Sequence, residues 1–280
     1  YEATKASATN PQTGESYPYK LSTPIHVVHE RTPQADPEPI NELELKTDFN
    51  FLLVAQLSPR KNIENSICWW VEEFFDQNVG LVVKTNSRSN SIMDFEMSSM
   101  AMNNLLSKYP DRKCKVYLLH GDLTAGQMTW LYRHNRIKSL ISLSHGEGFG
   151  LPIYEAAREA LPVIAVGWSG QLDFLVHDKQ KYFQEVEYSI SPVQNEAVWP
   201  GVIEKESKWA YADQGSYKMV LRKTKKQWKK AKKTAEQLKV LIDEKFSEEI
   251  LYAGFCKHFY NEEEDDLSTW LDTFQVKEYE

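Results

Sequence analysis

The chain has 280 residues, of which 41% are hydrophobic and 12% aromatic, so it can bury a core of its own and wholesale disorder is not expected. Its net charge of −7, from 40 acidic and 33 basic side chains, argues against a protein whose whole surface binds nucleic acid or an anionic membrane. Three scattered cysteines indicate neither a disulfide framework nor a zinc site, no apolar run is long enough for a membrane span, and no signal-peptide pattern opens the sequence. We therefore expect a cytoplasmic protein.

The first 48 residues, 1–48, predict an N-terminal arm or linker. Turn signals lie within Asn10–Gly14. The short apolar run Ile25–Val28 predicts at most one short strand, and residues 31–48 form a connection rich in proline and acidic side chains.

From residue 49 onward, short apolar runs alternate with helical patterns. The predicted strands cover 49–57, 79–83, 115–119, 139–143 and 163–166, and the predicted helices cover 63–75, 93–108, 124–132 and 152–160. This alternation indicates βαβ units, so we expect an α/β fold with a Rossmann-like parallel sheet of five strands flanked by helices. Ligands of such sheets bind beyond the carboxyl ends of the strands, where the loops after Leu57 and Leu143 lie.

The C-terminal third is predicted to be helical. Residues 209–244 form one long helical pattern whose apolar side chains recur at helical spacing, which is typical of packing. Eight basic residues between Arg222 and Lys233 favour a solvated helix face, and contact with a membrane surface or a nucleic acid stays open. The predicted domain therefore runs over 49–260, and 261–280 is predicted to be an acidic turn followed by a terminal helix, Leu267–Phe274.

The glycine-rich stretch between the fourth predicted strand and the helix after it is the most informative segment. It reads Ser-His-Gly-Glu-Gly-Phe-Gly-Leu-Pro-Ile-Tyr-Glu over 144–155. Glycine lets the backbone approach a ligand closely, and the free N–H groups at the start of a helix bind anions. Glu147 in the loop and Glu155 about one turn into the helix flank this turn. Two carboxylates beside an anion site suit a ligand that carries both hydroxyls and phosphates, such as a nucleotide sugar.

This segment resembles the donor-site motif of retaining GT-B glycosyltransferases of the group 1 family. Those enzymes carry Glu-Gly-Phe-Gly-Leu-Pro, then Glu, then a small-residue helix that ends in Gly-x-Pro-Val; here Ala160 stands where the family usually has glycine. Residues 51–62 resemble the family's first strand and phosphate loop and end in Pro-Arg-Lys-Asn, with Gln56 in place of the usual arginine. The likeness extends over residues 24–260 and implies the C-terminal, donor-binding half of a GT-B fold.

The resemblance also implies roles for particular residues. The donor would be a hexose linked to UDP, GDP or ADP, transferred with retention and without a metal or other cofactor. Arg60 and Lys61 would stabilise the departing diphosphate, and Glu147 would hold sugar hydroxyls near the reacting carbon. Glu155 would bind the ribose. The remaining residues of the implied donor site are Gly148, Phe149, Gly150, Leu151 and Gln56. No spacing among the seven histidines suggests a metal site.

Only the donor-binding half of such an enzyme is visible, because 48 residues are too few for the half that binds the acceptor. We therefore expect an incomplete enzyme that works with a nucleotide-sugar donor and a missing N-terminal acceptor-binding domain. For the basic segment 222–233, contact with a membrane surface or a polymeric acceptor stays open, and this would place the protein at the membrane periphery. Two alternatives remain open. The chain could be a non-catalytic nucleotide-sugar-binding or interaction module, or a fragment of a GT-B nucleotide-sugar epimerase.

Overall fold

The computed structural model describes residues 7–18, 26–29, 32 and 34–258, and the chain divides into two compact units. The larger unit is Arg31–Ser247, and the smaller comprises Tyr1–Glu30 and Glu248–Glu280. In the smaller unit the described elements are the antiparallel strands β1 (Ser7–Thr9) and β2 (Ser16–Pro18) and the helix α8 (Glu248–Cys256).

The predicted turn within the N-terminal arm is confirmed. Asn10 Oδ1 accepts a hydrogen bond from the N–H of Gln12 at 2.9 Å, and Gly14 has a φ of 71° in the link between β1 and β2. The predicted strand at 25–28 is wrong where it can be checked, because residues 26–28 have no regular structure; Ile25 lies outside the described residues. The predicted acidic turn and terminal helix at 261–280 also lie outside them.

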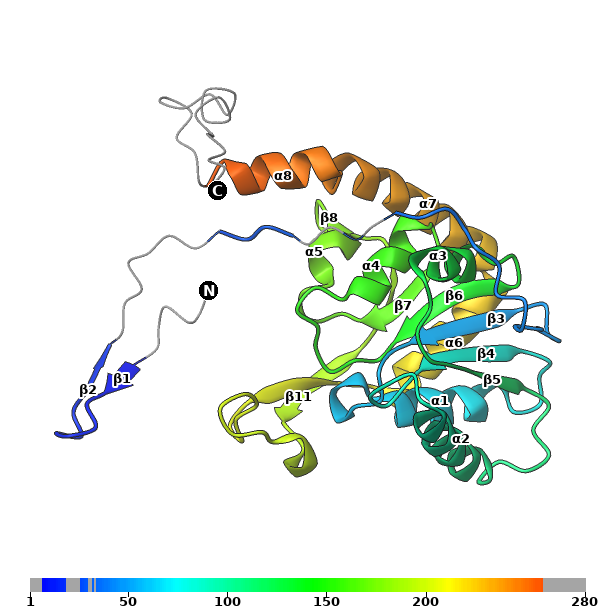
Figure 1. Ribbon diagram of the computed structural model, residues 1–280, viewed down its shortest axis with the longest axis horizontal. Coiled ribbons are helices and arrows are strands. Elements are labelled where there is room, and N and C mark those ends of the chain that lie inside the picture. Colours follow the sequence, from blue (N-terminus) through cyan, green and yellow to red (C-terminus); the bar gives the residue numbers. More distant parts are fainter. Residues whose placement is uncertain (1–6, 19–25, 30–31, 33, 259–280) are drawn as a thin grey trace, which may run out of the picture. The chain divides into compact units, whose positions relative to one another are not determined.

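A six-stranded, all-parallel sheet forms the centre of the larger unit (Figure 1). Its order is β10-β7-β6-β3-β4-β5. The strands are β3 (Asn50–Val54), β4 (Gly80–Thr85), β5 (Lys115–His120), β6 (Ile137–Ser142), β7 (Val163–Val166) and β10 (Gln184–Val186). The predicted Rossmann-like parallel sheet is confirmed. The prediction of five strands is wrong by one, because β10 is a three-residue edge strand in which Val186 alone is buried, too short to show a pattern.

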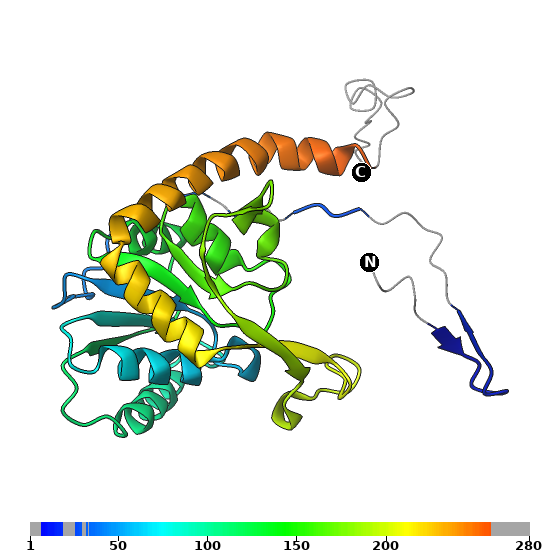
Figure 2. The ribbon, with the colours of Figure 1, turned by 180° about the vertical axis from the view of Figure 1, so that it is seen from behind.

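Helices cover both faces of this sheet. Helices α1 (Ile63–Phe74), α2 (Ile92–Leu106) and α6 (Gln214–Lys226) lie on one face, and α3 (Ala125–Arg133), α4 (Leu151–Arg158) and α7 (Trp228–Lys245) lie on the other. Figure 2 shows α6 running across its face beside α1. The remaining short elements are η2 (Pro59–Lys61), α5 (Leu172–Leu175), β8 (Val176–His177), β9 (Gln180–Lys181), β11 (Tyr188–Pro192), η3 (Asn195–Ala197) and β12 (Lys208–Ala212).

The long helix predicted at 209–244 is wrong in two places. Its first residues form β12, which pairs with β11, and the helix is interrupted at Gln227, which has φ −113° and ψ 32°. The basic segment 222–233 therefore spans the end of α6 and the start of α7. The predicted packing stripe is confirmed on α7, whose buried residues are Ala231, Ala235, Leu238 and Ile242. Among the described residues, no helix is both long and apolar enough to cross a membrane.

The core beneath α1 is built from alternate residues of the strands. Phe51 and Leu81 point to this face and pack with Trp70 and Phe74 of α1, all of them fully buried. This packing fixes which strand residues face α3 and α4 instead, because successive side chains of a strand point to opposite faces.

Ala160, just after the end of α4, stands where the family usually has glycine. Ala160 has a φ of 54°, in the left-handed region that glycine adopts without strain. The backbone at this position therefore needs a left-handed conformation, which glycine adopts without strain and which the present chain adopts with alanine.

Candidate functional site

The two sequence motifs meet at the one point in the sheet where the strand order reverses. From β3 the chain proceeds to β4 and β5 on one side, and then returns to β6 on the other side of β3. The loops after β3 and β6 therefore open next to each other at the carboxyl edge, which is where ligands of doubly wound sheets bind. His145 N–H donates to the carbonyl of Arg60 at 2.9 Å, so the two loops are in direct contact.

Three predicted residues form a charged triad across these loops. Glu147 Oε1 lies 2.6 Å from Lys61 Nζ, and its Oε2 lies 2.9 Å from Arg60 Nη1. The Glu147 and Lys61 side chains are 9% and 16% exposed, whereas Arg60 is 39% exposed. Burial alone would raise the pKa of Glu147, but the hydrogen bonds and charge of Lys61 and Arg60 prevail and hold that pKa below its usual value.

The loop that carries Glu147 is anchored from behind by the turn after β7. Ser169 Oγ accepts the N–H of Glu147 at 2.8 Å and donates to its carbonyl, and Gly170 N–H donates to the same carbonyl at 3.0 Å. Ser169 has a φ of 82°, a strained value for a residue other than glycine. A Cβ at Gly170 would lie 1.8 Å from the carbonyl oxygen of Gly148, so glycine is required for the two turns to approach.

The start of α4 supplies N–H groups beside the triad. Gly150 is the N-cap residue with φ 90°, and Pro152 occupies the first turn. Within the described chain, the N–H groups of Gly148, Gly150 and Leu151 donate to no protein acceptor. They can therefore donate hydrogen bonds to a bound anion. The Phe149 ring packs against Tyr154 and Phe174, with ring centres 5.1 and 5.0 Å away, so this side chain belongs to the packing beneath the loop.

Glu155 lies on α4 with a different set of neighbours. Its Oε2 accepts the hydroxyl hydrogen of Tyr132, a buried residue of α3, at 3.0 Å. Burial raises the pKa of Glu155, and the Tyr132 hydrogen bond and the charges of Arg158 and Lys84 only partly oppose that rise. The two motif glutamates thus have opposite environments: Glu147 is neutralised by two cations, and Glu155 is a partly buried carboxylate held by one hydroxyl.

Gln56 contributes to the shape of the loop after β3. Its Nε2 donates to the carbonyl of Ser87 at 2.9 Å, and Leu57 N–H donates to the carbonyl of Asn86 at 2.9 Å. The loop after β4 is itself held by Asp94, whose carboxylate accepts the N–H groups of residues 87–89 and contacts His120 Nε2 at 2.9 Å. These bonds lower the pKa of Asp94 well below its usual value. Gln56 therefore ties together two loops of the carboxyl edge.

His145 connects the glycine-rich loop to the hairpin of β11 and β12. Its Nδ1 lies 2.8 Å from the carbonyl oxygen of Ala210, and its ring stacks on Trp209 with centres 5.4 Å apart. The side chain is buried, and burial lowers its pKa. His145 is therefore a packing residue that positions the loop.

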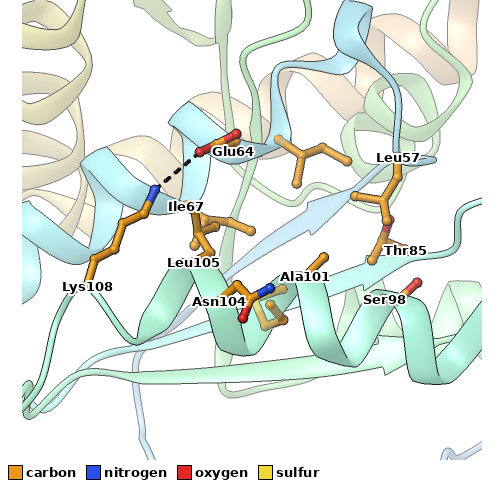
Figure 3. Close-up of a pocket in the computed structure, with 11 residues that line it drawn as sticks. Leu57, Glu64, Ile67, Thr85, Ser98, Ala101, Asn104, Leu105 and Lys108 are labelled. Atoms are coloured by element: carbon orange, nitrogen blue, oxygen red, sulfur yellow. Dashed lines mark ion pairs between the residues drawn. The ribbon is translucent and has the colours of Figure 1, made fainter.

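A separate cavity of about 340 Å³ lies between α1 and α2 (Figure 3). Its wall includes Leu57, Ile67 and Leu105, and the Glu64–Lys108 ion pair, 3.6 Å between Oε1 and Nζ, borders it. None of the nine site residues predicted from the sequence lines this cavity. Among the described residues, no cluster of three or more histidine, cysteine, aspartate or glutamate side chains could hold a metal ion.

Comparison with known proteins bears on the fold of the chain. No protein-family model matches the sequence. A serotype-specific mannosyltransferase, WbdA of Escherichia coli, is 30% identical over 118 residues, which are 41% of this chain and 13% of that protein. Among solved structures, S. aureus TarM in complex with fondaparinux, α-GlcNAc-glycerol and UDP matches 86% of this chain and 41% of its own, with 15% identity and a TM-score of 0.53.

Two further solved structures give the same result. Sucrose-phosphate synthase from Thermosynechococcus elongatus matches with 16% identity and a TM-score of 0.54, over 77% of this chain and 46% of its own. A glycosyltransferase from Rickettsia africae matches with 13% identity and a TM-score of 0.51, over 77% and 48%. The chain thus shares its fold with GT-B glycosyltransferases, and it spans less than half of each of these three solved chains.

Three residues beside the site were not predicted from the sequence. Tyr132 holds Glu155, Ser169 holds Glu147, and Lys84 is a charged residue near the end of the largely buried strand β4. Lys84 could have been noticed, because a lysine in a buried strand is unusual. Tyr132 and Ser169 give no local signal, since their partners lie 23 and 22 residues away along the chain.

Proposed function

We propose that this chain is the donor-binding half of a glycosyltransferase and that it binds a nucleoside-diphosphate sugar at the carboxyl edge of its sheet. The observation that carries the proposal is the triad of Arg60, Lys61 and Glu147 at the point where the strand order reverses, beside the free N–H groups of α4. The mannosyltransferase relative and the UDP complex of TarM support the same class of reaction.

The charge of the triad suits a diphosphate. Two cations and one carboxylate leave a net charge of +1 (2 − 1), and the N–H groups of α4 add partial positive charge. Negative charge accumulates on the diphosphate as its bond to the anomeric carbon breaks. Donors that are already fixed in place stabilise this transition state more than the ground state, which is how they accelerate the reaction. The protein itself supplies these donors, so the proposed transfer needs no metal.

The two glutamates take different parts of the donor in this proposal. Glu147, beside the phosphate-binding cations, accepts hydrogen bonds from hexose hydroxyls, and Glu155, held by Tyr132, accepts them from the ribose. The proposed transfer uses no protein nucleophile from this half. We propose transfer with retention on the strength of the motif resemblance, with the sugar moving from the nucleoside diphosphate to an acceptor hydroxyl.

The acceptor belongs to a second domain in this proposal. Orienting the acceptor hydroxyl can contribute about 7–11 kcal/mol to lowering the barrier, and one half of the cleft cannot supply it. A membrane surface or a polymeric acceptor could contact the basic segment 222–233 of a cytoplasmic or membrane-peripheral protein. Several of its charges are already engaged: Arg222 pairs with Glu73 at 2.7 Å, and Lys232 donates to the carbonyl of Ala160 at 2.8 Å.

Calorimetric titration with UDP-, GDP- and ADP-sugars tests donor binding directly. Lys61→Met should weaken the binding of the preferred donor by about 1.5–3 kcal/mol, the value of a charge-assisted hydrogen bond. Lys113→Met is the matched control, because Lys113 is 68% exposed and makes only a surface ion pair of 3.8 Å with Asp76. Failure of all three sugar nucleotides to bind, or equal affinities in both variants, would contradict the proposal.

A radiolabelled-donor assay tests whether sugar transfer needs a second, acceptor-binding domain. The chain alone should bind donor and transfer no sugar to added acceptors, because it lacks the acceptor wall. Efficient transfer by the chain alone would show that an acceptor site lies within these 280 residues.

A further inference from the structure

Lys84 is a partly buried lysine at the carboxyl edge of the sheet with no protein partner. It is the fifth of the six residues of β4, and its strand neighbours Val83 and Thr85 are both buried. Throughout the described chain, no hydrogen bond or ion pair involves its ammonium group. Placing a charge in a partly buried position without a partner is costly, so such a group points to a ligand.

The side chain of Lys84 lies on the same face of the sheet as Glu155. Leu81 and Val83 belong to the core under α1, so Lys84, one residue on, faces α3 and α4. The charges that it senses are those of Asp122, in the loop after β5, and Glu155 on α4. Burial lowers its pKa, and neither carboxylate is close enough to form an ion pair with it.

The order of the strands places Lys84 beyond the phosphate-binding end of the site. The triad lies at β3 and β6, and β4 is the next strand on the opposite side of β3 from β6, about 4.8 Å further along the sheet. In the binding mode assumed here, a nucleotide has its diphosphate at the triad, its ribose at Glu155 and its remaining part over β4. The part of the nucleotide that reaches Lys84 is then the base.

We propose that Lys84 binds a carbonyl oxygen of the nucleotide base and so selects uracil or guanine over adenine. This inference rests on the proposed function, since it assumes that a nucleotide binds here. An ammonium group is a hydrogen-bond donor only, and it pairs with carbonyl oxygens. Uracil and guanine present a carbonyl oxygen where adenine presents an amino group, which is itself a donor. At that position of the base, adenine would therefore offer the ammonium no acceptor.

The test compares Lys84→Met with the wild-type chain by calorimetry, using UDP, GDP, ADP and inorganic diphosphate. The wild-type chain should bind UDP or GDP more tightly than ADP. Lys84→Met should weaken the preferred nucleotide about tenfold or more, as expected for a charge-assisted hydrogen bond, and should reduce the preference over ADP. Affinity for inorganic diphosphate should stay within about twofold, because diphosphate reaches the triad alone.

Two controls make the result decisive. Lys115→Met removes an exposed lysine at the opposite, amino end of the neighbouring strand β5 and should leave all affinities unchanged. Urea unfolding should show Lys84→Met to be at least as stable as the wild type, because the variant no longer holds a partly buried charge. Unchanged UDP and GDP affinity, or an equal loss for inorganic diphosphate, overturns the base-binding role while the proposed function stands. Absence of nucleotide binding by the wild-type chain overturns both.

Discussion

Replacing Glu155 with glutamine should stabilise the folded protein at neutral pH. Tyr132 donates the one hydrogen bond that the carboxylate receives from described residues, at 3.0 Å, and the glutamine carbonyl can accept the same bond. The substitution therefore removes a partly buried charge and keeps its partner. Because a buried charge without full compensation costs about 1–3 kcal/mol, we expect Glu155→Gln to gain about 1 kcal/mol in the free energy of unfolding.

The pH dependence of this gain follows from the direction of the pKa shift. Burial raises the pKa of Glu155 in the folded chain above its ordinary value of 4.5. Between these two pKa values the folded state holds more protons than the unfolded state, so the stability of the wild type falls as pH rises through that interval. The difference between Glu155→Gln and wild type should thus be smallest below pH 4.5 and largest at neutral pH.

Urea unfolding at several pH values between 4 and 8 measures this difference. Glu159→Gln is the matched control, because Glu159 lies one helical turn further on and contacts Arg133 Nε at 2.5 Å. Its loss should destabilise the protein at neutral pH. Nucleotide titration of Glu155→Gln should show weaker binding of the bare nucleoside diphosphate. A Glu155→Gln variant that is less stable than wild type at pH 7, or whose stability difference does not change with pH, would refute the reasoning.

Two further substitutions test the glycine-rich loop. Glu147→Gln should lose about 1–3 kcal/mol of stability at neutral pH, since it leaves Lys61 without its full partner. Because the pKa of Glu147 is lowered in the folded state, this loss should shrink as the pH of the unfolding measurement falls below 4.5. A loss that does not change with pH would argue against the triad. Gly170→Ala should lose about 2 kcal/mol or more of stability in chemical unfolding, because its Cβ would overlap the carbonyl of Gly148. The control Gly148→Ala places a Cβ that meets nothing within 4 Å, so its stability should stay within about 0.5 kcal/mol of wild type. Similar losses in the two variants would contradict the close approach of the two turns.

Much of the fold and the core of the site could be predicted from local patterns. The apolar runs that became β3, β4, β5, β6 and β7 are short and bounded by polar turns, and they alternate with helical spacing, so they specify a parallel α/β sheet. The glycines and proline of residues 146–152 specify a turn into a helix because they meet conformational needs that few other residues meet. Glu147 and Glu155 are predicted as site residues because they lie within this local pattern.

What the sequence did not reveal depends on partners that are distant along the chain. Residues 209–212 look helical by spacing, yet they form β12 because β11 lies alongside and His145 stacks on Trp209. The pairing of Glu147 with Lys61 joins residues that are 86 positions apart, and the opposite pKa shifts of the two glutamates come from which side chains surround each one. Local propensity sets which backbone conformations are favourable, but burial and charge depend on the folded neighbours, so only the tertiary structure decided them.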